Sequence, residues 1–138
     1  MGLVAATLAE LGVERAFVVH GEGGLDEISL AGETMVAEVR GETVKRFTVT
    51  PEDFGVARAS LDSVGGGTAA ENADLIRRIL EDEPGPGRDI VVVNAAAALV
   101  AAGVAGNFRE GAGLASFVIS SGAAGEKLAS LAKFTSGT

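Results

Sequence analysis

The 138-residue sequence contains no cysteine, no tryptophan, no tyrosine and only one histidine. Without cysteine it can form neither disulfide bonds nor thiolate metal sites, and it offers no thiol nucleophile, which is compatible with a reducing compartment. Without tryptophan or tyrosine it lacks the usual stacking surfaces for single-stranded nucleic acid. The single histidine, His20, gives no basis for a Ser-His-Asp arrangement.

Positive charge is also scarce. The chain has 11 Lys and Arg residues against 19 Asp and Glu residues, a net charge of −8. No basic patch is visible, so nucleic acid is not expected as a partner. The N-terminal stretch lacks the basic region of a signal peptide. The longest apolar run, Ile90–Ala105, is interrupted by Asn94 and Gly103 and is shorter than the roughly 20 residues of a membrane span. We therefore expect a soluble, cytoplasmic protein with no membrane partner.

Hydrophobic residues make up 47% of the chain, enough for a packed core and too many for a disordered segment. The length fits one domain, predicted over residues 1–138. Apolar residues at helical spacing predict a helix over Leu3–Leu11 that stops at Gly12. The β-branched and aromatic run Arg15–His20 then predicts a buried strand. A helix, a glycine and a strand in this order are typical of an α/β sheet.

Two alternating segments, Met35–Arg40 and Thr43–Thr50, predict a β-hairpin around Gly41. Met35, Ala37 and Val39 would form an apolar face of its first strand.

Most of the rest of the chain is predicted to be helical, except for Gly55–Gly67, which is expected to be irregular. Cap and stop signals, with apolar spacing, predict helices that start at Pro51, run from Thr68 to about Asp82, and cover Asp89–Gly103, Asn107–Ser120 and Ala123–Phe134. The predicted fold class is α/β: a partial sheet, made of a buried strand and a β-hairpin, packed with about five helices.

One segment has residues suited to binding a cation. Asp26 and Glu27 follow the glycine-rich stretch Gly21–Gly24, directly after the first predicted strand. Neighbouring side chains on a strand point to opposite faces, so two adjacent acids converge only where the backbone leaves strand geometry, which glycines permit. Mg²⁺ takes one or two carboxylates and completes its shell with waters and phosphates. The alternative is a solvated acidic pair without a ligand.

Three other features have ordinary structural interpretations. His20 is expected to be a half-buried, satisfied side chain rather than a ligand or base. Gly65–Gly67 lacks the lysine of a phosphate loop, so a connection capped by Thr68 is favoured over an anion site. Asn94 interrupts an apolar run, and a buried amide needs partners. We expect it to make a structural hydrogen bond that braces a loop.

Several blocks together resemble the C-terminal part of anthranilate phosphoribosyltransferase. They are Val18–Leu30 (VVHGEGGLDEISL), Thr50–Gly55 (TPEDFG), Ala69–Leu80 (AAENADLIRRIL), Arg88–Gly103 (RDIVVVNAAAALVAAG) and the ending Ser121–Thr135. The resemblance implies a piece of the larger α/β domain of these enzymes, which transfer phosphoribosyl from phosphoribosyl pyrophosphate to anthranilate in tryptophan biosynthesis. It also implies that Asp26 and Glu27 hold a Mg²⁺ bound to the pyrophosphate.

The sequence lacks several segments that are typical of this family. The Gly-Thr-Gly-Gly-Asp and Lys-His-Gly-Asn segments, the arginine that positions anthranilate, and the N-terminal helical domain are not in it. We therefore expect a C-terminal fragment that is inactive alone and that self-associates or pairs with the missing N-terminal portion through exposed apolar helix faces, above all Ile90–Ala102. The alternative is a non-catalytic assembly or regulatory module that keeps the fold. A nucleic-acid-binding relative is disfavoured by the net charge.

Overall fold

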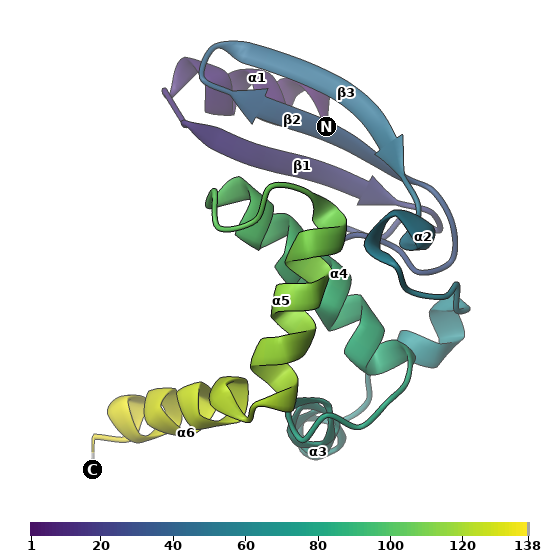
Figure 1. Cartoon of the computed structure of the whole chain (residues 1–138), viewed down its shortest axis with the longest axis vertical. Coiled ribbons are helices and arrows are strands. Elements are labelled where there is room, and N and C mark those ends of the chain that lie inside the picture. The colour runs from purple at the N-terminus through teal and green to yellow at the C-terminus, as the bar shows by residue number, and fades with distance from the viewer. Residues whose placement is uncertain (138) are drawn as a thin grey trace.

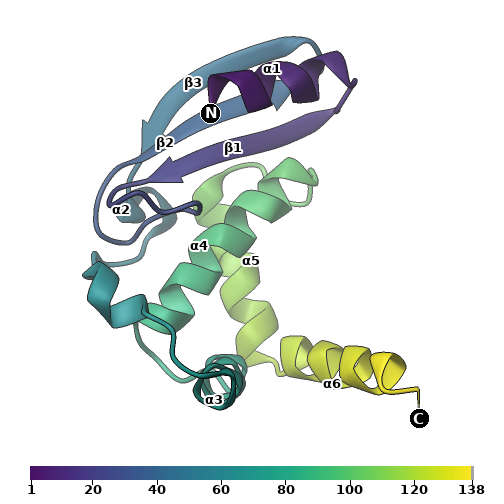
Figure 2. The same cartoon turned by 180° about the vertical axis from the view of Figure 1, so that it is seen from behind.

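A three-stranded sheet lies between one short helix and a group of longer helices (Figures 1 and 2). The computed structural model describes residues 1–137; Thr138, the last residue of the predicted domain, lies outside them. The elements in chain order are α1 (Gly2–Glu10), β1 (Arg15–Gly21), β2 (Thr34–Arg40), β3 (Thr43–Val49), α2 (Pro51–Phe54), the 3₁₀ turn η1 (Leu61–Val64), α3 (Ala69–Leu80), α4 (Pro86–Ala101), α5 (Phe108–Ser120) and α6 (Ala123–Thr135). The α/β class and the predicted elements are confirmed, with η1 in a stretch expected to be irregular.

The sheet is antiparallel, in the order β1-β2-β3. Alternation along β2 places Ala37 and Val39 against Ala5 of α1, whereas Val36 faces the main core on the other side. Met35 shares the face of Ala37 as predicted but lies near the end of the strand and is 47% exposed.

A buried strand was predicted at this position, but the first strand is only half-buried along most of its length. Within residues 1–137, β1 pairs with β2 alone and forms one edge of the sheet. An edge strand has no neighbour on one side, so its side chains keep more contact with water.

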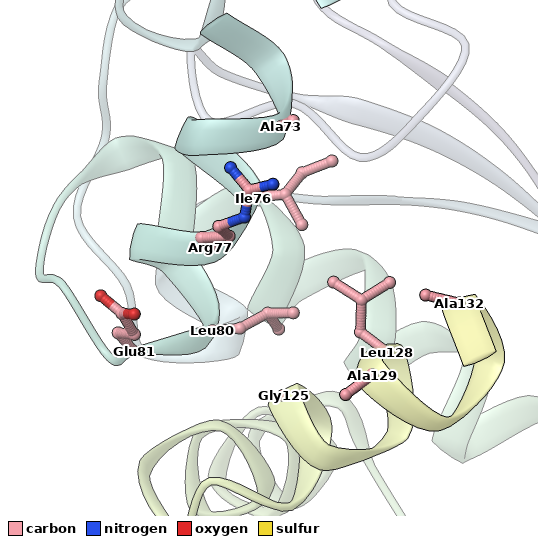
Figure 3. A pocket seen from close by; sticks show the side chains of 9 residues that line it. All are labelled: Ala73, Ile76, Arg77, Leu80, Glu81, Gly125, Leu128, Ala129 and Ala132. Carbon is pink, nitrogen blue, oxygen red and sulfur yellow. The ribbon is translucent and has the colours of Figure 1, made fainter. Parts of the chain in front are cut away.

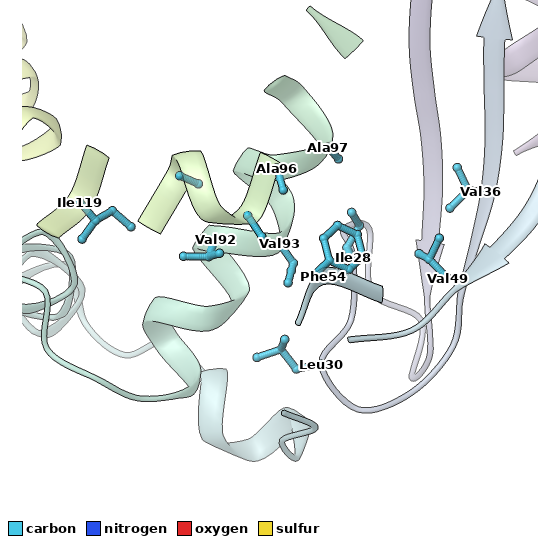
Figure 4. Close-up of a cluster of buried hydrophobic side chains, with 12 residues drawn as sticks. Ile28, Leu30, Val36, Val49, Phe54, Val92, Val93, Ala96, Ala97 and Ile119 are labelled. Atoms are coloured by element: carbon cyan, nitrogen blue, oxygen red, sulfur yellow. The ribbon is translucent and has the colours of Figure 1, made fainter. Parts of the chain in front are cut away.

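The main core joins the second face of the sheet to the long helices (Figure 4). Val92, Val93 and Ala96 of α4 are almost fully buried there. The α4 segment was expected to be the exposed apolar face, and this was wrong, because α5 and the sheet cover it. Branched aliphatic and alanine side chains let these elements approach closely.

The exposed apolar side chains lie instead on the last two helices. Phe117 of α5 is 68% exposed, and Leu131 and Phe134 of α6 are 56% and 85% exposed. Between α3 and α6 a groove of about 540 Å³ is lined by apolar side chains that include Ile76 and Leu128 (Figure 3). None of the helices within residues 1–137 has both the length and the apolar content that a membrane span requires.

Candidate functional site

The acidic pair lies in the loop that connects β1 to β2, and both Asp26 and Glu27 are exposed. Among residues 1–137, none of the ion pairs that form involves either carboxylate. The structure thus presents two adjacent carboxylates to solvent, and no cation of residues 1–137 forms an ion pair with either of them.

The loop leaves strand geometry at the glycines, as predicted. Gly23 and Gly24 both adopt φ +83°, a left-handed conformation that favours glycine. The Gly21 amide donates to the Leu25 carbonyl at 2.9 Å, and the Glu22 amide donates to the Glu33 carbonyl at 2.9 Å. The backbone therefore closes a tight turn immediately before the acidic pair.

Asn94 fixes the chain immediately after the acidic pair. The Ile28 amide donates to Asn94 Oδ1 at 2.9 Å, and Asn94 Nδ2 donates to the Ile28 carbonyl at 3.3 Å and to the Ile90 carbonyl at 2.9 Å. The prediction that Asn94 braces a loop is confirmed, and the braced loop is the one that holds Asp26 and Glu27.

A buried polar cluster, which no sequence pattern indicated, also supports the loop. Ser29 and Thr34 are fully buried. The Ser29 amide donates to Thr34 Oγ1 at 3.0 Å, and Ser29 Oγ donates to the Glu22 carbonyl at 3.2 Å. These bonds satisfy backbone groups that have no strand partner, so they stabilise the irregular path of the loop.

Gly21 has a second role that sequence patterns did not reveal. A Cβ atom at this position would lie 2.6 Å from the Glu27 carbonyl oxygen and 2.8 Å from Ser29 Cβ. The end of β1 thus packs directly against the backbone of the acidic pair, and only glycine leaves room for this approach.

Electrostatics favour a cation here. Partial desolvation, and then the charge of Asp26, raise the pKa of Glu27 above its ordinary value. A divalent cation would relieve the repulsion between the two carboxylates. In the described part of the chain no cluster of three or more His, Cys, Asp or Glu residues could hold a metal. Two carboxylates fit Mg²⁺, which completes its shell with waters and substrate phosphates.

The other two candidate positions, His20 and the Gly65–Gly67 stretch, show no arrangement for binding a ligand in the described residues. His20 is exposed, whereas a half-buried side chain was expected. It is the last residue but one of β1, which is an edge strand. The Gly67 amide donates to Asn72 Oδ1 at 2.7 Å, and Thr68 forms a capping box with Glu71. The interpretation of this stretch as a capped connection is confirmed, and the Gly67 amide already has a partner.

Comparison with known proteins agrees with the resemblance found in the motifs. Residues 1–125 match the family described as "Glycosyl transferase family, a/b domain". The anthranilate phosphoribosyltransferases of Parvibaculum lavamentivorans and Pelotomaculum thermopropionicum are 48% and 51% identical over 96% of this chain. The chain spans 39% of the length of these relatives.

Solved structures agree. The crystal structure of anthranilate phosphoribosyltransferase from Thermus thermophilus is 43% identical with a TM-score of 0.78, over 86% of this chain and 34% of that chain. The Saccharomyces cerevisiae enzyme in complex with PRPP and Mg is 28% identical with a TM-score of 0.70, over 78% of this chain and 31% of that chain. The chain belongs to the glycosyl transferase family, as part of the α/β domain that it shares with the anthranilate phosphoribosyltransferases.

Proposed function

We propose that this chain contributes the magnesium-binding corner of an anthranilate phosphoribosyltransferase site. In this reaction the ribose of phosphoribosyl pyrophosphate is transferred to the amine of anthranilate, and pyrophosphate leaves. The observation that carries the proposal is the exposed pair Asp26 and Glu27 on a braced loop, free of ion pairs within residues 1–137. The names of the relatives, and the yeast complex with PRPP and Mg, support the choice of substrate and ion.

Asp26 and Glu27 would hold the ion through hard carboxylate oxygens. Bound there, Mg²⁺ would offset the negative charge that develops on the departing pyrophosphate. The chain has a net charge of −8, so by itself it repels a diphosphate. By binding a divalent cation, the acidic pair would replace this repulsion with a local attraction for the diphosphate.

The site needs residues from outside this chain. We propose that the chain alone is inactive and that it works with the part of the enzyme that corresponds to the remaining length of its relatives. Exposed apolar side chains on α5 and α6, including Phe117 and Phe134, are available for pairing with that part or for self-association. The proposal also places the protein in the cytoplasm, as expected of an enzyme of amino-acid biosynthesis.

A complementation experiment tests the proposal. The 138-residue chain is mixed with a separately produced polypeptide that covers the part of the Parvibaculum lavamentivorans relative it does not match, and formation of phosphoribosyl anthranilate is measured. We expect product from the mixture with Mg²⁺ and none from either polypeptide alone. Turnover by the 138-residue chain alone would overturn the proposed incompleteness.

Neutralised variants link activity to the acidic pair. The double variant Asp26→Asn, Glu27→Gln should abolish product formation by the mixture. The double variant Glu10→Gln, Glu14→Gln removes the same charge from exposed positions on and after α1, and should leave activity unchanged. If both double variants are equally active, the acidic pair has no part in the reaction.

A further inference from the structure

The side chain of Asn94 acts as a substitute for a neighbouring strand. Its carbonyl accepts from the Ile28 amide and its amino group donates to the Ile28 carbonyl, so one side chain satisfies both backbone polar groups of that residue. The third bond, from Nδ2 to the Ile90 carbonyl, ties the same amide to the preceding turn of α4. Only one orientation of the amide satisfies all three bonds, since only the carbonyl accepts and only the NH₂ donates.

Ile28 is the residue where the loop enters the core. Ile28 is 1% exposed, as is Leu30, whereas the preceding Asp26 and Glu27 are exposed. The Ile28 side chain belongs to the main cluster together with Val93 of α4. The contact with Asn94 is therefore made at the boundary between solvent and core, one residue after the acidic pair.

The acidic pair is held between two fixed points. Before it, Leu25 is bonded through its carbonyl to the Gly21 amide. After it, Ile28 is bonded to Asn94. Only Asp26 and Glu27 lie between these anchors, so their backbone has little freedom to separate the carboxylates.

We propose that Asn94 is a positioning residue for divalent-cation binding: through Ile28 it sets the path of the loop that carries Asp26 and Glu27, and so couples α4 to the metal ligands. The inference rests on the proposed function, because it concerns the same acidic pair. Groups that orient metal ligands without contacting the metal commonly increase metal affinity by about 10-fold or more. Asn94 does this through the backbone, without touching the ion.

The test uses Mn²⁺, which favours the same oxygen ligands as Mg²⁺ and broadens nearby NMR signals. The 138-residue chain is titrated with Mn²⁺, and the broadening of the Asp26 and Glu27 backbone amide signals gives the affinity. Asn94→Ala should weaken it about 10-fold. Asn94→Gln keeps both hydrogen-bonding groups one methylene further out, and should weaken it less.

The chain offers a matched control. Asn72 pairs in the same way with another loop: its Oδ1 accepts from the Gly67 amide at 2.7 Å and its Nδ2 donates to the Gly67 carbonyl at 3.2 Å. Asn72→Ala removes the two bonds that this residue of α3 makes to the loop before the helix, far along the chain from the acidic pair, so Mn²⁺ affinity should stay at the parent level. If Asn94 had a purely structural role, Asn94→Ala would behave like Asn72→Ala in the titration: its thermal stability would fall, but its Mn²⁺ affinity would stay at the parent level.

The outcomes separate the two claims. If the parent binds Mn²⁺ at Asp26 and Glu27 but Asn94→Ala binds it equally well, the positioning role is wrong and the proposed function stands. If Asn94→Ala does not fold, parent-like affinity in Asn94→Gln overturns the positioning role. If the parent shows no selective broadening at Asp26 and Glu27, the proposed metal site is wrong, and the positioning role fails with it.

Discussion

Gly111 of α5 lies against the backbone of Ala96 in α4: a Cβ atom at Gly111 would be 2.8 Å from the Ala96 carbonyl oxygen. Both residues are buried where α4 and α5, which both contribute to the main core, cross each other. The absence of a side chain at Gly111 lets the two helices approach this closely, and α4 in turn positions Asn94 behind the acidic loop.

The first prediction concerns this contact. Gly111→Ala should destabilise the chain by about 1–3 kcal/mol, because the added methyl group meets backbone rather than a movable side chain. Gly113→Ala, two residues along the same helix, has nothing within 4 Å of its added Cβ and should stabilise by about 0.5–1 kcal/mol through helix propensity. Urea unfolding of both variants gives the comparison. Equal stability would show that the α4–α5 contact is looser than described.

A second prediction concerns Gly21. Gly21→Ala should destabilise by about 1–3 kcal/mol, because its Cβ would press on the Glu27 carbonyl and on Ser29. It should also shift the NMR signals of the acidic loop. Gly65→Ala is the control, since the nearest atom to its Cβ, the Asp62 carbonyl oxygen, is 3.7 Å away. A Gly21→Ala chain with parent stability and unshifted loop signals would contradict the close approach.

A third prediction concerns pH. Glu38 is 12% exposed, and its Oε1 accepts from Arg40 Nε at 2.7 Å and lies 3.0 Å from Arg15 Nη2. Burial alone would raise the pKa of Glu38, but the hydrogen bonds and charges of Arg40 and Arg15 together lower it below its ordinary value. The ion pairs therefore stabilise the fold above the unfolded-state pKa of about 4.3. This contribution is lost as the pH falls through the lower folded-state pKa.

Thermal unfolding tests this between about pH 6 and about pH 3. Glu38→Gln should be less stable than the parent at the upper end, by about 1.5–3 kcal/mol for bonds to charged groups. The difference should shrink toward the lower end, where the parent carboxylate becomes protonated. A difference that is constant across this range would exclude a stabilising charge at Glu38.

A fourth prediction concerns the exposed face of α5 and α6. Phe117→Ser with Phe134→Ser should reduce self-association and hydrophobic-dye binding, because these side chains are 68% and 85% exposed. Val104→Ser, at a position 60% exposed in the connection between α4 and α5, should change neither. Sedimentation velocity and dye fluorescence give the readouts. A parent chain that is strictly monomeric and binds no dye would contradict the prediction.

The parts of the fold that follow from local chemistry could be predicted from the sequence. The Thr68–Glu71 capping box and the Asn107 cap each depend on residues within one turn, and both are present. The hairpin depends on alternation around a glycine, and it too is present. The residues that form a cap or a hairpin turn are only a few positions apart along the chain, so these features can be recognised from the sequence alone.

The parts that depend on distant segments could not be predicted. The polarity of Asn94 indicated that it needs partners, but the partner, Ile28, lies 66 residues away. The close approaches at Gly21 and Gly111 leave no local pattern, because only tertiary packing creates them. The apolar run of α4 suggested an exposed face, yet the exposed face is on α5 and α6, since the sheet and α5 already cover α4.

The central claim is that Asp26 and Glu27 hold a divalent cation against the diphosphate of the substrate. Calorimetry of phosphoribosyl pyrophosphate binding to the complemented enzyme, with and without Mg²⁺, measures this most directly. The parent should bind phosphoribosyl pyrophosphate more tightly with Mg²⁺ than without it. In the double variant Asp26→Asn, Glu27→Gln, the factor by which Mg²⁺ increases this affinity should be at least about tenfold smaller, which corresponds to about 1.4 kcal/mol. Equal affinity and equal Mg²⁺ dependence in parent and variant would contradict the claim.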